Sequence, residues 1–222
     1  AFTDLAKKKG AFIKEGEKVL RLEKDPFGIK ITTNKKSYLS KKAVMTAGAW
    51  TGELISDFTS LLTPVRQVMG WFKPKREEEF TKEVFPVFNL LVKEGHFYGF
   101  PSLDQTGLKI GKWQHRHEKT APDKLRTDID KEDEEVLRSC LKHYFPKANG
   151  DLLNAKACMF TNTPDEHFLI HQNPDIPLLS ASGFSGHGFK FCSVIGEILS
   201  QLIAKGKSEY DIDLFSKERF ER

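Results

Sequence analysis

The sequence predicts an α/β (α+β) protein in which an α/β layer is interrupted by an inserted antiparallel sheet with a helix. Near the C-terminus, an apolar run at 176–179 leads into SASGFSGHGFKF (180–191), and a helical pattern continues to Gly206. A strand, a glycine-rich turn and a helix are typical of α/β proteins that bind anionic cofactors. Between residues 62 and 115, strand-like runs separated by charged or Gly/Pro turns favour an antiparallel sheet.

The N-terminal part is predicted to alternate helix and strand. A short helix over 2–9 ends at Gly10, and alternating apolar and charged residues predict strands at 11–14 and 17–24. The runs GIKITT and KSYLS, joined at 34–36, form a hairpin-like pair. The stretch 41–55 reads as a buried strand followed by a turn of small residues and a helix that starts at Trp50.

The inserted part is predicted to contain four strands and a capped helix. The strands cover 66–74, 84–92, 96–102 and 107–115, and the helix lies within 123–145 with Asp128 or Asp130 as its N-cap. Two further strand-like runs turn at Thr163-Pro164-Asp165, and the charged tail 207–222 is expected on the surface. The predicted domains are 1–61 and 161–222 in one layer and 62–160 as the insertion.

Composition excludes several classes of function. The net charge is only +4, acids and bases are interspersed, and the lysine clusters are short, so nucleic-acid binding is not expected. The three cysteines form no CxxC pattern, which favours a reducing, cytoplasmic compartment without disulfides. No apolar run reaches the roughly 18 residues of a membrane span.

Residue types alone leave the candidate chemistry open. Lys109, in GLKIG, lies on the strand face opposite Leu108 and Ile110, where an exposed lysine is the ordinary interpretation. Tyr98 is typical of strand packing, and a lone cysteine such as Cys158 in an apolar strand is usually an inert small side chain.

Two further patterns give little support for a catalytic or metal site. His115 and His117 have no third ligand in a matching context, so no metal site is expected. Ser185, in GFSGHG, lacks the final glycine of the hydrolase pattern G-x-S-x-G. The residues alone therefore indicate an α/β protein with a glycine-rich ligand turn, in which His187 and Lys190 add a titratable ring and a cation.

Several longer strings resemble one family. CMFTNTPDEHFLI and ASGFSGHGFKF, with YGFPS and GLKIG upstream and TAGAW earlier, are similar to the monomeric sarcosine oxidase and N-methyltryptophan oxidase family. That family belongs to the D-amino-acid-oxidase-like flavoproteins, and the resemblance covers nearly the whole chain. It implies that the α/β layer is part of an FAD/NAD(P)-binding-type domain and that the insertion is the substrate domain.

The family's N-terminal G-x-G-x-x-G motif does not occur in this sequence. The resemblance therefore implies a C-terminal fragment without the Rossmann motif. Such a fragment is expected to bind FAD weakly or not at all and to be inactive. Its former interface, apolar around 42–50 and 176–190, is expected to be exposed and to favour dimerisation.

The resemblance also implies roles for individual residues. Cys158 matches the cysteine that carries FAD covalently, and Lys109 matches a lysine near flavin N5 that stabilises charge when oxygen is reduced. Lys190 matches the lysine that pairs with the substrate carboxylate, and Tyr98 and His187 match residues that line the substrate cavity. The further cofactor-contacting positions implied are Thr46, Ala47, Gly48, Trp50, Gly186, Gly188 and Phe189.

One departure bears on the substrate. Where sarcosine oxidases have an active-site histidine, this sequence has Trp113, which puts sarcosine itself in doubt as the preferred substrate. The resemblance implies oxidation of an N-methyl amino acid to an imine, with oxygen reduced to hydrogen peroxide. The alternatives are a related FAD-dependent amino or imino acid oxidase or dehydrogenase, such as a glycine oxidase, and a non-catalytic binding subunit that retains the fold.

Overall fold

The computed structural model describes residues 1–103 and 106–221, which divide into two compact units. The first unit comprises Ala1–Thr46, Ile170–Ala181 and Ser193–Arg222, and the second comprises Ala47–Leu169 and Ser182–Cys192. The chain therefore starts in the first unit, passes into the second, and returns to the first at Ile170. The glycine-rich turn then belongs to the second unit, and the chain ends in the first. This mixed helix and sheet architecture confirms the predicted fold class.

The first unit begins with α1 (Phe2–Lys8) and an antiparallel sheet of β1 (Val19–Asp25), β2 (Gly28–Thr33) and β3 (Ser37–Ser40). The predicted helix and the hairpin-like pair are both confirmed. The strand expected at 11–14 is wrong: these residues form no strand, and the side chain of Phe12 is 89% exposed. Alternation favours a strand only where one face is buried against a partner.

A second sheet of the first unit has the strand order β10-β11-β4, and β11 is parallel to β4. Its strands are β4 (Ala43–Met45), β10 (Leu169–Gln172) and β11 (Leu178–Ser182). Helix α4 (Cys192–Lys205) buries Ile195, Ile198 and Leu202, which follow the helical spacing and so lie on one face. Two single-turn helices, Asp213–Phe215 and Lys217–Phe220, occupy the charged tail.

The second unit is built on a five-stranded sheet of order β6-β7-β8-β5-β9, in which neighbouring strands are antiparallel, as predicted. Its strands are β5 (Thr63–Phe72), β6 (Phe88–Val92), β7 (Gly95–Phe100), β8 (Leu108–Lys112) and β9 (Leu152–Asn162). The remaining short helical segments are Gly48–Trp50, α2 (Thr51–Leu54), Ser56–Phe58, Glu77–Glu79, Pro122–Lys124, Pro146–Ala148 and Phe189–Phe191.

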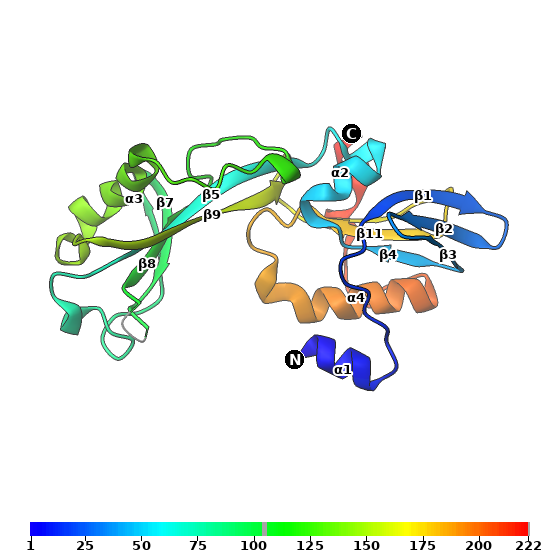
Figure 1. Cartoon of the computed structure of the whole chain (residues 1–222), viewed down its shortest axis with the longest axis horizontal. Coiled ribbons are helices and arrows are strands. Elements are labelled where there is room, and N and C mark those ends of the chain that lie inside the picture. The colour runs from blue at the N-terminus through cyan, green and yellow to red at the C-terminus, as the bar shows by residue number, and fades with distance from the viewer. Residues whose placement is uncertain (104–105, 222) are drawn as a thin grey trace. The chain divides into compact units, whose positions relative to one another are not determined.

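Helix α3 (Lys131–Tyr144) packs on one face of this sheet (Figure 1). Leu137, Cys140 and Leu141 of the helix are fully buried against strand residues such as Phe97 and Ile110. Asp130 is the N-cap: its side chain accepts from the backbone N–H of Asp133, and the Asp133 side chain accepts in return, which is a capping box. Of the two predicted caps, the structure therefore uses Asp130.

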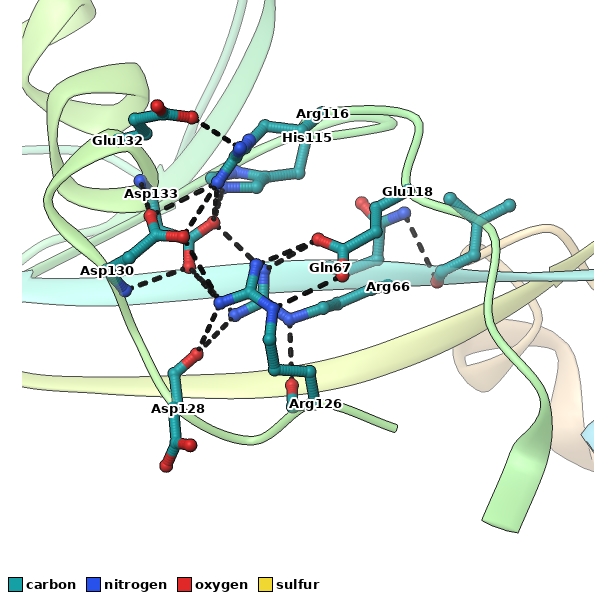
Figure 2. Close-up of polar contacts among 11 residues, drawn as sticks. Arg66, Gln67, His115, Arg116, Glu118, Arg126, Asp128, Asp130, Glu132 and Asp133 are labelled. Atoms are coloured by element: carbon teal, nitrogen blue, oxygen red, sulfur yellow. Dashed lines mark hydrogen bonds and ion pairs between the residues drawn. The ribbon is translucent and has the colours of Figure 1, made fainter. Parts of the chain in front are cut away.

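A buried polar cluster fixes the loop between β8 and α3 (Figure 2). Arg66 of β5, 1% exposed, donates Nη1 and Nη2 to the two carboxylate oxygens of Asp133 at 2.9 and 2.8 Å. Its Nε donates to the carbonyl oxygen of Arg126 at 2.8 Å, and Nη2 also donates to that of Asp128 at 2.8 Å. A bidentate arginine–carboxylate pair is directional, so it orients β5 and the start of α3 together.

The same cluster holds His115 neutral. Burial lowers the pKa of His115, and this outweighs its hydrogen bond to the Asp133 carboxylate (Nε2 to Oδ1, 3.1 Å). Burial alone would raise the pKa of Asp133, but hydrogen bonds from Arg66 and the Asp130 backbone hold that pKa well below its usual range. His115 Nδ1 is buried without a hydrogen-bond partner among the described residues.

This arrangement predicts a pH dependence of stability. Because the pKa of His115 is lower in the folded protein, the unfolded chain binds more protons below its ordinary pKa of about 6.5, and the free energy of unfolding falls as the pH is lowered. Urea unfolding between about pH 7 and pH 5 should show this decline. His115→Gln should flatten it, whereas the exposed His117→Gln should leave it unchanged; equal slopes in all three proteins would contradict the prediction.

Candidate functional site

The cross-strand register places three predicted site residues on one face of the five-stranded sheet. Tyr98 lies opposite Gly111, Lys109 opposite Trp71, and Cys158 opposite Gln67. Side chains alternate along a strand and directly paired residues share a face, so these positions all lie on the same side. The other side carries the core beneath α3. We call the first side the site face, defined by Gln67, Trp71, Tyr98, Lys109, Trp113, Cys158 and Phe160.

Two aromatic rings restrict the ammonium group of Lys109, so it does not move freely as a surface lysine does. Its neighbours Leu108 and Ile110 are fully buried on the α3 side, as the alternation predicts. Its Nζ lies 5.2 Å from the ring centroid of Trp71 and 5.3 Å from that of Phe100. Cation–π attraction to two rings restricts the position of the charge on the site face.

Tyr98 packs directly over a glycine of the next strand. A Cβ placed on Gly111 would lie 2.6 Å from Cζ and 2.7 Å from the hydroxyl oxygen of Tyr98, so this approach needs glycine. Burial raises the pKa of Tyr98 to about 12, with a further contribution from Cys158. The phenol therefore stays neutral and able to donate a hydrogen bond.

Cys158 is half-buried in β9 beside this pair. Burial raises the pKa of its thiol, and the positive charges of Lys109 and Arg66 offset part of that rise. Opposite it, Gln67 is fully buried and its Oε1 has no hydrogen-bond partner among the described residues. The same is true of Oδ1 of Asn162, which alternation places on the same face as Cys158. An unpaired buried amide oxygen is costly, so these positions favour a polar ligand.

A second group of residues joins the site face to the glycine-rich turn. The ring of Trp113 lies 5.3 Å from that of Phe160 and 5.8 Å from that of His187, measured between centroids. Glu166 accepts from Trp113 Nε1 at 3.2 Å through its carboxylate, and its carbonyl oxygen bonds His187 Nε2 at 3.1 Å. The structure thus brings His187 next to the Trp113 and Phe160 side of the site face.

The glycine-rich turn itself packs against β9. Gly186 has φ +82°, and a Cβ there would lie 2.4 Å from the ring of Phe160. The sequence predicted that the helix begins directly after the turn. Instead, a 3-10 turn at Phe189–Phe191 precedes α4. Lys190 lies on that turn, exposed, with its Nζ 5.4 Å from the ring centroid of Phe191, and Phe189 is 92% exposed. Gly188 packs against the Phe184 side chain.

The other expected cofactor turn follows β4. Thr46 belongs to the first unit, whereas Ala47, Gly48 and Trp50 belong to the second. The turn at Gly48–Trp50 lies against β9, the strand of Cys158, and Gly48 has φ +54°. Trp50 Nε1 donates to Asp123 Oδ1 at 2.9 Å, which fixes the indole. Ala47 and Gly48 thus lie in a turn that approaches the strand of Cys158.

Residues 1–202 match the DAO family of FAD dependent oxidoreductases. The chain belongs to this family. It is 40% identical over 225 residues to a monomeric sarcosine oxidase of Bacillus sp. (strain B-0618), a match that covers 99% of this chain and 57% of the relative. It is 33% identical to an N-methyl-L-tryptophan oxidase of Escherichia coli O139:H28, covering 91% of this chain and 54% of the relative. The resemblance drawn from the sequence motifs is thereby confirmed.

Solved structures agree on the fold. The L-proline dehydrogenase of P. horikoshii superposes with a TM-score of 0.83 at 23% identity, covering 100% of this chain and 58% of that one. The glycine oxidase of Geobacillus kaustophilus gives 0.74 at 18% identity, covering 95% and 54%. The chain therefore spans somewhat more than half the length of the relatives it matches.

The described residues fit a flavin on the site face. A flavin is a polar aromatic ring with an N–H donor and carbonyl acceptors. The second unit offers it the half-buried thiol of Cys158, the ammonium group of Lys109, and two buried amide oxygens that have no hydrogen-bond partner among the described residues. Across 1–103 and 106–221, no group of three or more His, Cys, Asp or Glu is arranged to hold a metal ion. No helix in the same ranges is long and apolar enough to cross a membrane.

Sequence reasoning missed Gln67 and Glu166. The signal for Gln67 was that it is a polar residue within the strand-like run RQVMGWF. Alternation along this strand places its side chain on the site face, opposite Cys158. Glu166 lay inside the quoted string CMFTNTPDEHFLI without being singled out. Its importance depends on a tertiary contact with Trp113, which is 53 residues away in the chain.

The contact between Gly111 and Tyr98 predicts a sensitive glycine. Gly111→Ala should displace the Tyr98 ring and lower the free energy of unfolding by about 1–3 kcal/mol, because the added methyl overpacks the site face. Gly196→Ala in α4 is the control, since no atom lies within 4 Å of its added Cβ. Its stability should be unchanged or raised by up to about 1 kcal/mol. Similar urea midpoints for both variants would show that Tyr98 does not require Gly111.

Proposed function

We propose that this chain carries the substrate domain and part of the FAD-binding domain of an oxidase that acts on the secondary amine of N-methyl amino acids. The observation that carries the proposal is the gathering of Cys158, Lys109 and Tyr98 on one sheet face, in a chain 40% identical to monomeric sarcosine oxidase. The domains would be 62–160 for the substrate and 1–61 with 161–222 for the cofactor.

FAD, when bound, supplies the acceptor for a hydride equivalent and passes the electrons to oxygen, which gives hydrogen peroxide. The residues of this chain hold and orient the reactants. Cys158 provides the sulfur for a covalent thioether to the flavin. Lys109, held between two aromatic rings, provides a fixed positive charge where oxygen is reduced. Thr46, Ala47, Gly48, Trp50, Gly186, Gly188 and Phe189 would contact the cofactor.

The substrate would be held through its carboxylate and its amine. Lys190 lies on an exposed turn, where a flexible ammonium can reach a carboxylate, and His187 and Tyr98 would line the cavity. Tyr98, neutral because its pKa is raised to about 12, can donate a hydrogen bond. The imine product then hydrolyses to an amino acid and an aldehyde. Trp113 favours an N-methyl amino acid other than sarcosine, because the resemblance implies a histidine at this position of the sequence.

A second candidate is an FAD-dependent amino or imino acid oxidase of the glycine oxidase kind, because the chain shares the fold of the glycine oxidase of Geobacillus kaustophilus. A non-catalytic binding subunit is disfavoured because packing alone does not require Cys158, Lys109 and Lys190 together. Residues 1–222 by themselves are expected to bind FAD weakly and to be inactive, since they contain no G-x-G-x-x-G turn for the pyrophosphate.

The covalent linkage is tested by mass. The protein, expressed as its gene encodes it, should retain a flavin-sized mass increment after acid denaturation, and Cys158→Ala should abolish the increment. Cys192→Ala is the matched control, because that thiol is free and exposed, and it should keep the increment. A yellow, active protein without the increment would favour a non-covalent relative, and a colourless, inactive protein would favour the binding subunit.

The role of Lys109 is tested by separating the two half-reactions. Lys109→Met should slow reoxidation of the reduced protein by oxygen on the order of 10²-fold, because a preorganised charge is lost, while anaerobic reduction by substrate changes little. Lys112→Met is the control: it lies on the same strand but the opposite face, with its Nζ 6.0 Å from the ring centroid of Phe97. Equal slowing in both variants would exclude a specific role for Lys109.

A further inference from the structure

Glu166 connects two residues of the candidate site, Trp113 and His187, with the neighbouring Gln114 through three different acceptor atoms. Its Oε2 accepts from Trp113 Nε1 at 3.2 Å and its Oε1 from Gln114 Nε2 at 2.5 Å. Its backbone carbonyl oxygen bonds His187 Nε2 at 3.1 Å. Its φ is +61°, a left-handed conformation that is uncommon for glutamate. Strained backbone of this kind persists where the surrounding structure demands it, and it is frequent at functional sites.

The carbonyl contact determines the tautomer of His187. A carbonyl oxygen can only accept, so Nε2 must carry the hydrogen and the neutral ring keeps its lone pair on Nδ1. The ring is also confined by its neighbours, since its centroid lies 4.9 Å from that of Phe168 and 5.8 Å from that of Trp113. In its neutral form His187 therefore presents Nδ1 as a hydrogen-bond acceptor with a fixed orientation.

The carboxylate contact determines the orientation of Trp113. The indole is stacked at 26° to His96, with centroids 5.9 Å apart, and is tilted against Phe160 at 5.3 Å. Rings alone leave an indole free to slide in its plane, whereas a hydrogen bond from Nε1 to a charged acceptor fixes it. Gln114 holds the same carboxylate from the other side and in turn accepts from Asn162 Nδ2 at 2.8 Å.

We propose that Glu166 is a positioning residue of the candidate site. Its carbonyl holds His187 in the Nε2–H tautomer, with Nδ1 free to accept the N–H of the substrate amine. Its carboxylate fixes the Trp113 indole as the wall that selects the substrate side chain. The effect on substrate selection rests on the proposed amine oxidase function, whereas the geometry of the two rings does not.

The side-chain and backbone contributions can be separated by choosing substitutions for their backbone preference. Glu166→Gly accepts the positive φ and keeps the carbonyl in place, so it should free Trp113 and leave His187 unchanged. Glu166→Val cannot adopt this conformation without strain, so it should disturb both rings. His117→Gly is the matched control, because His117 is exposed and also has a positive φ, of 55°.

The first measurement is NMR of the protein as its gene encodes it, with ¹⁵N-labelled histidine and tryptophan. The parent protein should show His187 as the Nε2–H tautomer and a shifted Trp113 indole N–H signal. Glu166→Gly should change only the indole signal, Glu166→Val should change both, and His117→Gly neither. An Nδ1–H tautomer in the parent, or an indole signal unaffected by Glu166→Gly, would overturn the proposal.

The second measurement is steady-state oxidation of sarcosine and N-methyl-L-tryptophan by the FAD-loaded protein. Glu166→Gly should change the ratio of the two KM values about tenfold, the factor that one hydrogen bond to a charged acceptor supplies, with kcat within about twofold. An unchanged ratio in an active variant would refute the selective role. If the parent oxidises no N-methyl amino acid, the proposed function fails, and the NMR result still decides whether Glu166 positions the two rings.

Discussion

The register of β5 against its two neighbours is the constraint on which the rest of the second unit depends. β5 pairs with β8 on one side and β9 on the other, so it is the strand through which Lys109 and Cys158 are aligned. Because side chains alternate, a slip of one residue would move each of them to the side that α3 covers. The chemistry proposed for the site face therefore requires a correct register in two ladders at once.

The pair of Arg66 and Asp133 explains why this register is well determined. Arg66 lies one position before Gln67, so the two side chains point to opposite faces: Arg66 into the polar cluster and Gln67 toward Cys158. A slip of β5 would separate two buried charges from each other, at a cost of several kcal/mol. The consequence of this buried ion pair is that it specifies the register of β5, because every shifted register separates the two charges.

The sequence predicted the parts of this fold that depend on local pattern. The hairpin at 28–40, the strands of the five-stranded sheet and the capped helix α3 follow from alternation, turn residues and an aspartate N-cap. The strand expected at 11–14 failed because alternation does not reveal whether a partner strand exists. The start of α4 was misplaced because a 3-10 turn and an α-helix have similar apolar spacing over three residues.

The site was predictable only in part, for a related reason. Lys109 and Cys158 stand in motifs, and alternation within their own strands indicates which face each occupies, but not that the two faces coincide. That coincidence depends on the pairing of both strands with β5, in which Trp71 lies 38 residues before Lys109 and Gln67 lies 91 residues before Cys158. The role proposed for Glu166 depends on a loop backbone conformation and on two distant ring nitrogens, which no local pattern encodes.

Asp133 has one further consequence because it takes part in two structures at once. Its carboxylate completes the capping box of α3 and also receives both guanidinium nitrogens of Arg66. If the first turn of α3 frayed, Arg66 would lose its buried bidentate partner and keep only the longer contact to Glu118, at 3.4 Å, while still buried in the sheet. Fraying of the helix and opening of β5 are therefore coupled, and the helix start should exchange its amide hydrogens as slowly as β5. A helix end is ordinarily the first part of a helix to open; here it belongs to the most cooperative part of the unit.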